Sequence, residues 1–184
     1  MTVELEIRHS PGLVDGRRIE RTAARAVLPR GDRLLMLRSR HGDYKFPGGG
    51  LEDGETAAAA LRRELREECG LHRVRAGSLL VRAVEISAAR EAGAVFRMTS
   101  LYFRVSADTD RAVAPELEDY ERDLELTPLW VTPRAARAAN RRLLVGADRA
   151  VRAGLPWLER EARVLGLLLG GAFAIGPSSS RRGR

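Results

Sequence analysis

Cysteine is almost missing from this chain of 184 residues, since Cys69 is the only one. A single cysteine excludes an intrachain disulfide, which is typical of proteins kept in a reducing compartment. The first ten residues, MTVELEIRHS, also lack the basic-then-apolar pattern of a secretory signal peptide. We therefore expect a cytoplasmic protein.

Long apolar runs are missing as well. One extended stretch, residues 164–180, carries no charge. It is shorter than the roughly 20 apolar residues that cross a bilayer, and Gly, Pro and Ser interrupt it. We expect no contact with a membrane.

Lysine is as scarce as cysteine, because Lys45 is the only lysine among 32 basic residues. The net charge is +7, but Arg181, Arg182 and Arg184 supply part of it from a Ser/Gly-rich tail. The remaining arginines suit a solvated surface, or a site for an anionic ligand, because a guanidinium binds phosphate through two parallel hydrogen bonds. No arginine block is interleaved with aromatic residues, so we expect no nucleic acid as the main partner.

The apolar pattern predicts one mixed domain of α+β type, with more strands than helices. Residues 1–20 form an N-terminal strand and loop, residues 21–169 the main domain with a C-terminal helix, and residues 170–184 a tail without regular structure. A hairpin joins the strands at 22–28 and 33–38, and a second hairpin joins those at 79–87 and 95–106. The other expected elements are strands at 3–8 and 124–131, helices at 56–69 and from residues 133 and 156, and an acidic irregular segment at 108–123.

Three carboxylates crowd the end of the helix predicted over residues 56–69. On a helical wheel Glu68 falls inside the apolar arc around Leu61, and Glu64 and Glu67 follow it outward. Carboxylates about 5 Å apart repel by roughly 3 kcal/mol at an effective dielectric constant near 20. Burial and the helix dipole both disfavour the negative charge further. Mg²⁺ or Mn²⁺ would relieve these costs, so we expect the helix to hold a divalent metal.

A glycine-rich segment, KFPGGGLEDGE, precedes this helix. Consecutive glycines let a backbone approach a ligand closely. Glu52 and Glu55 add two carboxylates just before the helix begins. Loop and helix together therefore bring up to five carboxylates to one place.

These residues resemble the Nudix box, G-x5-E-x7-R-E-U-x-E-E-x-G-U with U aliphatic. The nine fixed positions, which span 23 residues, all match: Gly49, Glu55, Arg63, Glu64, Leu65, Glu67, Glu68, Gly70 and Leu71. The resemblance covers about residues 22–140. It implies an α/β/α sandwich around a mixed sheet, and metal-dependent hydrolysis of a nucleoside diphosphate linked to another group.

The resemblance also implies roles for individual residues. Glu64, Glu67 and Glu68 would be metal ligands, with Gly48 as a further candidate. Arg63 and Glu55 would form a supporting pair. Gly49 and Gly50, with Arg38 and Arg40 after the second strand, are candidates for binding the substrate phosphates. The general base would be a box glutamate or an acid of the later segment, where Glu118 is preferred over Glu116 and Glu121.

Two other readings stay open. A Nudix-fold module that has lost catalysis would bind nucleotides or regulate, although such modules usually have a degraded box. An isopentenyl diphosphate isomerase would need Cys69 as its thiol, but the wheel directs Cys69 to the core. Box residues contact the diphosphate and not the base or sugar, so the candidate substrates include oxidised nucleoside triphosphates, NDP-sugars and ADP-ribose. The N-terminal strand would allow a homodimer.

Overall fold

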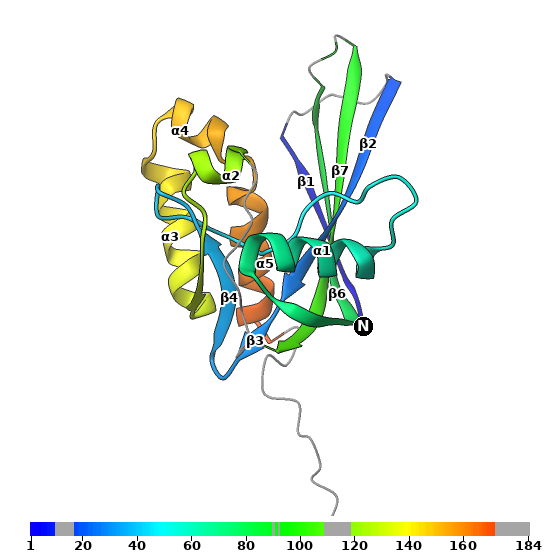
Figure 1. The fold of residues 1–184 in the computed structure, drawn as a ribbon. Coiled ribbons are helices and arrows are strands. Elements are labelled where there is room, and N and C mark those ends of the chain that lie inside the picture. The colour runs from blue at the N-terminus through cyan, green and yellow to red at the C-terminus, as the bar shows by residue number, and fades with distance from the viewer. Residues whose placement is uncertain (10–16, 90, 92, 109–118, 172–184) are drawn as a thin grey trace, which may run out of the picture.

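The computed structural model describes residues 1–9, 17–89, 91, 93–108 and 119–171, and these residues form two four-stranded sheets (Figure 1). The first sheet has the order β1 (Val3–Arg8), β6 (His72–Ala88), β7 (Ala94–Asp108), β2 (Arg17–Val27). Its two central strands are antiparallel, and each outer strand runs parallel to its neighbour, so the sheet is mixed.

The second sheet is built around β4 (Arg33–Arg38). This strand pairs antiparallel with β3 (Pro29–Arg30), with β5 (Tyr44–Lys45) and with β8 (Thr127–Val131). The segment that follows β5 runs back to the first sheet, where Ala24 and Ala26 donate backbone hydrogen bonds to Gly49 and Pro47. The glycine-rich loop is therefore fixed to β2.

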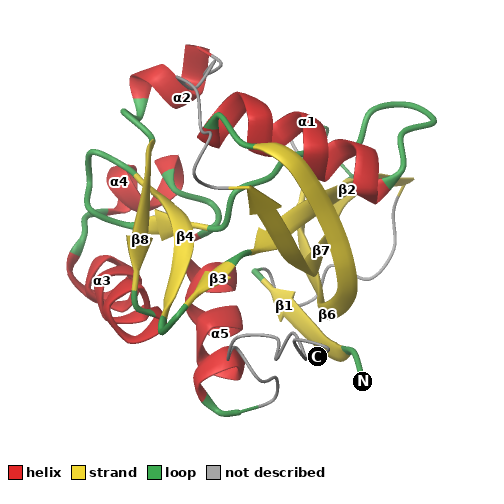
Figure 2. Ribbon diagram, turned by 60° about the horizontal axis from the view of Figure 1, so that its bottom comes forward, coloured by secondary structure: helices red, strands yellow, loops and turns green. Residues whose placement is uncertain are grey.

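Helices cover both sides of the sheets (Figure 2). The helix α1 (Ala57–Cys69) lies on one side, and α3 (Pro133–Gly146) and α5 (Leu158–Leu169) lie on the other. Two short helices, α2 (Asp119–Asp123) and α4 (Arg149–Gly154), complete the described part of the chain. This arrangement confirms the expected α/β/α sandwich.

Two hydrophobic cores fill the spaces between these layers. Because successive side chains of a strand point to opposite faces, Leu35 and Leu37 of β4 enter the core under α1, whereas Leu34 and Met36 enter the core under α5. All four side chains are buried. The strand β4 is thus packed on both faces.

The ends of α1 lie where the sequence predicts them. The Thr56 hydroxyl accepts a hydrogen bond from the Ala59 backbone N–H, which caps the first turn. Gly70 adopts φ 63°, a left-handed conformation that costs a residue with a side chain more than it costs glycine. Its N–H bonds to the Arg66 carbonyl oxygen and ends the helix.

Several expected elements need correction. The hairpin expected over 22–28 and 33–38 is present only next to its turn, where β3 and Leu28 pair with the start of β4, because β2 itself pairs in parallel with β7. The final helix begins at Leu158 rather than at Pro156, and α4 was not expected. The acidic segment is helical at α2, while residues 109–118 lie outside the described residues. The hairpin of β6 and β7 and the helix after Thr132 are confirmed.

None of the helices in the described ranges is both long and apolar enough to cross a bilayer. The uncharged stretch from residue 164 begins inside α5, where Val164, Leu165 and Leu168 are buried against the sheets.

Candidate active site

Glu68 is the most enclosed acid of the box, with 1% of its surface exposed. The backbone N–H of Gly48 donates to Glu68 Oε2 over 2.5 Å, which ties the glycine loop to the last turn of α1. The other oxygen, Oε1, lies 2.9 Å from Lys45 Nζ. The helical wheel placed Glu68 correctly, but it gave no sign of the lysine that balances its charge.

Lys45 joins Glu68 to a second buried acid. Its Nζ is also 3.6 Å from Glu121 Oε1 in α2, and Glu121 is 2% exposed. Burial, with the Glu121 charge nearby, raises the pKa of Glu68 to about 8, although the Lys45 charge acts in the opposite direction. The only lysine of the chain therefore holds two carboxylates inside the protein.

Glu64 lies against the backbone of the glycine loop. A Cβ atom at Gly49 would collide with the Glu64 carboxylate, so the carboxylate keeps this position only beside a residue without a side chain. Burial raises the pKa of Glu64, and hydrogen bonding from Arg63 partly offsets this effect. The loop and the helix thus form a cradle around this carboxylate.

Arg63 connects the start of the box to its end. Its guanidinium donates to Glu55 Oε2 over 2.9 Å, to the Gly50 carbonyl over 3.0 Å and to Glu64 Oε1 over 2.8 Å. The hydrogen bond from Arg63 lowers the pKa of Glu55. The expected pairing of Arg63 with Glu55 is present, and it also fixes the loop around Gly50.

Glu67 is the most accessible of the three helix acids. It lies 3.5 Å from Arg63 and 3.3 Å from Arg66, and 26% of its side-chain surface is exposed. Each box acid therefore faces a cation of the chain, so the repulsion expected from the wheel is compensated. Across the described residues, no three His, Cys, Asp or Glu side chains already converge as an ion site.

The donor set still suits a hard divalent ion. Three carboxylates on consecutive turns offer the oxygen ligands that Mg²⁺ and Mn²⁺ prefer, and the buried Glu68 Oε1 already faces a cation, Lys45 Nζ, at 2.9 Å. The Gly48 carbonyl accepts a hydrogen bond from Arg25. Metal binding by Glu64, Glu67, Glu68 and Gly48 stays a prediction.

A groove of about 440 Å³ opens beside the box. Glu64 and Arg63 form one wall, and Arg21 and Arg25 of β2 face it. Its other lining residues are Gly49, Gly50, Leu51, Glu52 and Met98. Arginines opposite carboxylates provide the two kinds of contact that a diphosphate with bound metal needs.

Sequence reasoning missed Arg21 and Arg25. A signal was present, because they stand four residues apart in β2, which places them on one face of the strand. Arg38 and Arg40 are exposed near the end of β4 and are not among the residues that line the groove. Their role in phosphate binding stays a prediction.

The remaining candidates are placed as follows. Glu116 and Glu118 lie outside the described residues, and Glu121 is the acid of that segment that reaches the box through Lys45. Cys69 is a free, buried thiol in the core under α1, and burial raises its pKa. It has no access to the groove.

Comparisons with known proteins show what this chain resembles. The RNA pyrophosphohydrolase of Acinetobacter baylyi is 37% identical over 78 residues, which cover 42% of each chain. This chain thus matches less than half the length of that relative. Among solved structures, a UDP-X diphosphatase has a TM-score of 0.46 at 15% identity and covers 63% of this chain and 52% of its own. A NUDIX hydrolase from Nitrosomonas europaea has a TM-score of 0.45 at 18% identity, covering 77% and 90%.

The NUDIX domain family matches residues 20–152, which is well over half of the chain. This range contains the complete box, the Arg63 clamp and the groove beside Glu64. The protein belongs to the Nudix hydrolase family.

Proposed function

We propose that this protein is a metal-dependent pyrophosphohydrolase that cleaves a nucleoside diphosphate linked to another group. The observation that carries the proposal is the groove in which Glu64 and the Arg63 clamp face Arg21 and Arg25. The fixed positions of the box are all intact, which favours catalysis over a binding module that has lost it. Cytoplasmic location and the absence of a membrane partner remain predictions.

Different residues would bind the diphosphate, position the box and hold the metal. Arg21 and Arg25 bind the diphosphate from the strand side, because guanidinium groups bind phosphate oxygens in pairs. Arg63 holds Glu64 and the Gly50 backbone in register with each other. Bound Mg²⁺ or Mn²⁺ would supply charge neutralisation and a more acidic water. Glu64, Glu67 and Glu68 would hold it.

Glu121 is the better supported candidate for the general base outside the box. It is buried beside Lys45, next to Glu68, whereas Glu118 rests on its sequence position alone. Replacing each by glutamine separates the two, since only loss of the true base lowers kcat while substrate affinity is kept.

The decisive experiment is a substrate panel with Mg²⁺ or Mn²⁺ that measures phosphate, pyrophosphate or nucleoside monophosphate release. The panel contains oxidised nucleoside triphosphates, NDP-sugars and ADP-ribose. It also contains phosphorylated RNA, since the Acinetobacter relative is an RNA pyrophosphohydrolase. We expect turnover that excess EDTA abolishes and that Glu67→Gln reduces at least about a hundredfold. Tight binding without turnover of any substrate would instead favour the inactive module.

A further inference from the structure

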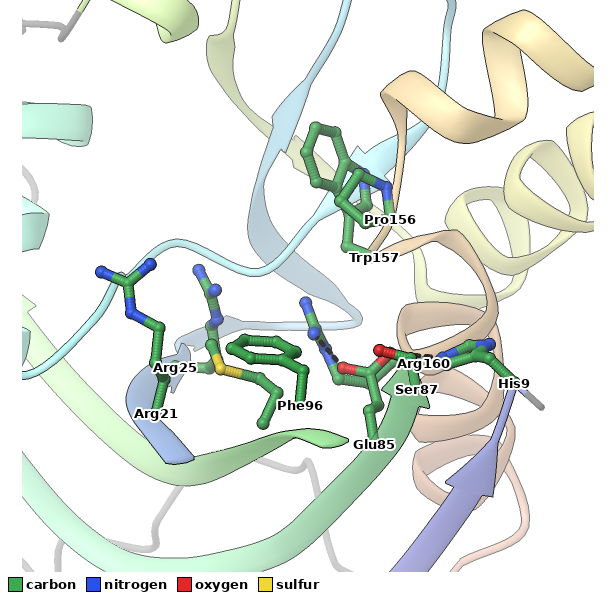
Figure 3. A pocket seen from close by; sticks show the side chains of 10 residues that line it. His9, Arg21, Arg25, Glu85, Ser87, Phe96, Pro156, Trp157 and Arg160 are labelled. Atoms are coloured by element: carbon green, nitrogen blue, oxygen red, sulfur yellow. Dashed lines mark hydrogen bonds and ion pairs between the residues drawn. The ribbon is translucent and has the colours of Figure 1, made fainter. Parts of the chain in front are cut away.

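A second hollow, of about 250 Å³, adjoins the groove and shares Arg21, Arg25 and Met98 with it. The strand register explains which side chains line the bottom of this second hollow. Arg21 is paired with Met98, Met98 with Glu85, and Glu85 with Ile7, so these side chains lie on one face of the first sheet. Figure 3 shows Phe96 on this floor and Trp157 above it. Two aromatic side chains therefore border a space that begins at the arginines of the groove.

A third hollow, of about 330 Å³, lies further along at the junction of α4 and α5. It shares His9, Ser87 and Pro156 with the second hollow, so the two meet at these residues. The His9 ring sits on this boundary. Its Nε2 is 3.2 Å from Glu85 in the second hollow, and its Nδ1 is 3.7 Å from Glu159 in the third.

We propose that the three hollows form one track for a 5′-phosphorylated chain of at least two nucleotides. The inference rests on the proposed function, since it assigns the diphosphate to the groove beside Glu64. The first nucleoside then occupies the second hollow, against Phe96 and Trp157. The second nucleotide occupies the third hollow.

Two kinds of substrate carry two bases, namely a dinucleoside polyphosphate and the end of an oligonucleotide. The positions of the three hollows relative to one another distinguish them. In a dinucleoside polyphosphate the second nucleoside lies beyond the phosphates, on the far side of the groove. In an oligonucleotide end it lies beyond the first nucleoside. The third hollow adjoins the second hollow through His9 and Ser87 and shares no lining residue with the groove. The geometry therefore favours the oligonucleotide end.

Charge in the third hollow supports a phosphodiester there. Arg152 lines it from α4 and is exposed, and its Nη1 donates to the Leu144 carbonyl oxygen over 3.1 Å. The one lining acid, Glu159, is balanced by Arg163 at 2.5 Å. The hollow therefore presents a cation to an incoming phosphate, and the exposed Pro156 offers apolar surface to a base.

The test compares binding of a 5′-phosphorylated dinucleotide with binding of the matching nucleoside monophosphate, without metal, followed by titration calorimetry. We expect the dinucleotide to bind at least about tenfold more tightly, because its phosphodiester adds a charge-assisted contact with Arg152. Arg152→Ser should remove most of this gain. The matched control is Arg149→Ser, an exposed arginine of the same helix that does not line the hollow.

A second pair of variants tests volume instead of charge. Ala153 lines the third hollow and Ala150 does not, although both are exposed on α4. Ala153→Trp should fill the hollow and abolish the dinucleotide advantage, whereas Ala150→Trp should keep it. This pair also decides the matter if Arg152→Ser weakens the fold through the lost bond to Leu144.

Three results would overturn the track. They are equal affinity of the wild type for mononucleotide and dinucleotide, equal losses in Arg152→Ser and Arg149→Ser, and a gain of the same size for a dinucleoside diphosphate. Since binding is measured without metal and without turnover, a failure here is distinct from failure of the hydrolase proposal. With an active enzyme, the ratio of kcat/KM for the two substrates should fall in Arg152→Ser.

Discussion

Glu68 couples the stability of the metal-free protein to pH. Its folded pKa, about 8, lies above the ordinary value of 4.5 because the side chain is buried. The folded state therefore binds the proton more tightly than the unfolded state does. The resulting stabilisation is complete below about pH 4.5 and is lost as the pH rises through about 8.

Glu68→Gln should remove this pH dependence. Denaturant unfolding at pH 5 and pH 8.5 in EDTA should show that the wild type loses more stability than the variant, by no more than roughly 5 kcal/mol. Parallel curves for the two proteins would mean that Glu68 titrates normally.

Gly49→Ala should lower turnover while leaving the fold intact. The new Cβ would collide with the Glu64 carboxylate, which must move away from the groove. We expect kcat/KM to fall at least about tenfold and the melting temperature to change little, because the displaced group is a side chain. Gly146→Ala is the matched control, since a Cβ there meets open space. Full activity in Gly49→Ala would show that the close approach has no role.

At the residue scale, the sequence predicts the box well and its counter-charges poorly. Helical periodicity alone places Glu68 in the core, and the resemblance to the Nudix box pairs Arg63 with Glu55. Lys45 and Glu121 are 76 residues apart in the sequence and meet only through the packing of α2 against the loop. The sequence also does not show that Arg21 faces the groove, because this depends on the pairing of β2 with β7.

At the scale of elements, α5 is fastened to the first sheet by a buried ionic cluster. Arg160 is 5% exposed, donates to Glu85 of β6 and to Tyr102 of β7, and lies 3.0 Å from Glu161. Removing the arginine of such a cluster leaves buried carboxylates without their main counter-charge.

Arg160→Met should therefore destabilise the protein by about 3–5 kcal/mol. Arg163→Met on the same helix breaks only an exposed pair with Glu159 and should cost at most about 1 kcal/mol. Chemical denaturation of both variants measures the difference. Similar losses would show that the cluster does not fasten α5.

Elements with strong local signals were predictable. The cap at Thr56 and the left-handed Gly70 mark α1, and Thr132 with Pro133 marks the start of α3. The partner of β2 was not predictable, because a strand carries its facing pattern but not the identity of its neighbour. Proximity in sequence favoured β4, whereas the parallel pairing with β7 satisfies the alternating cores on both sides of the sheet.

At the scale of the whole molecule, metal binding should stabilise the wild type more than Glu67→Gln. A ligand present at a hundred times its Kd adds about 2.7 kcal/mol to the folded state. Without metal the two proteins should melt alike, since Glu67 already faces Arg63 and Arg66 and removing its charge relieves no repulsion. Thermal melts of both proteins with and without Mg²⁺ give the answer. Equal shifts on adding Mg²⁺ would exclude Glu67 as a ligand.

The parallel pairing of β2 with β7 also has a consequence during synthesis on the ribosome. Arg17 pairs with Ala94, and Leu34 of β4 pairs with Val131, so both strands are made long before their partners. At about 5–20 residues per second, a nascent chain carries the finished box for several seconds before β8 emerges. During that interval the apolar face of α1, with Leu61 and Leu65, has no complete sheet to cover it. The newly made box is thus a segment that a chaperone would bind.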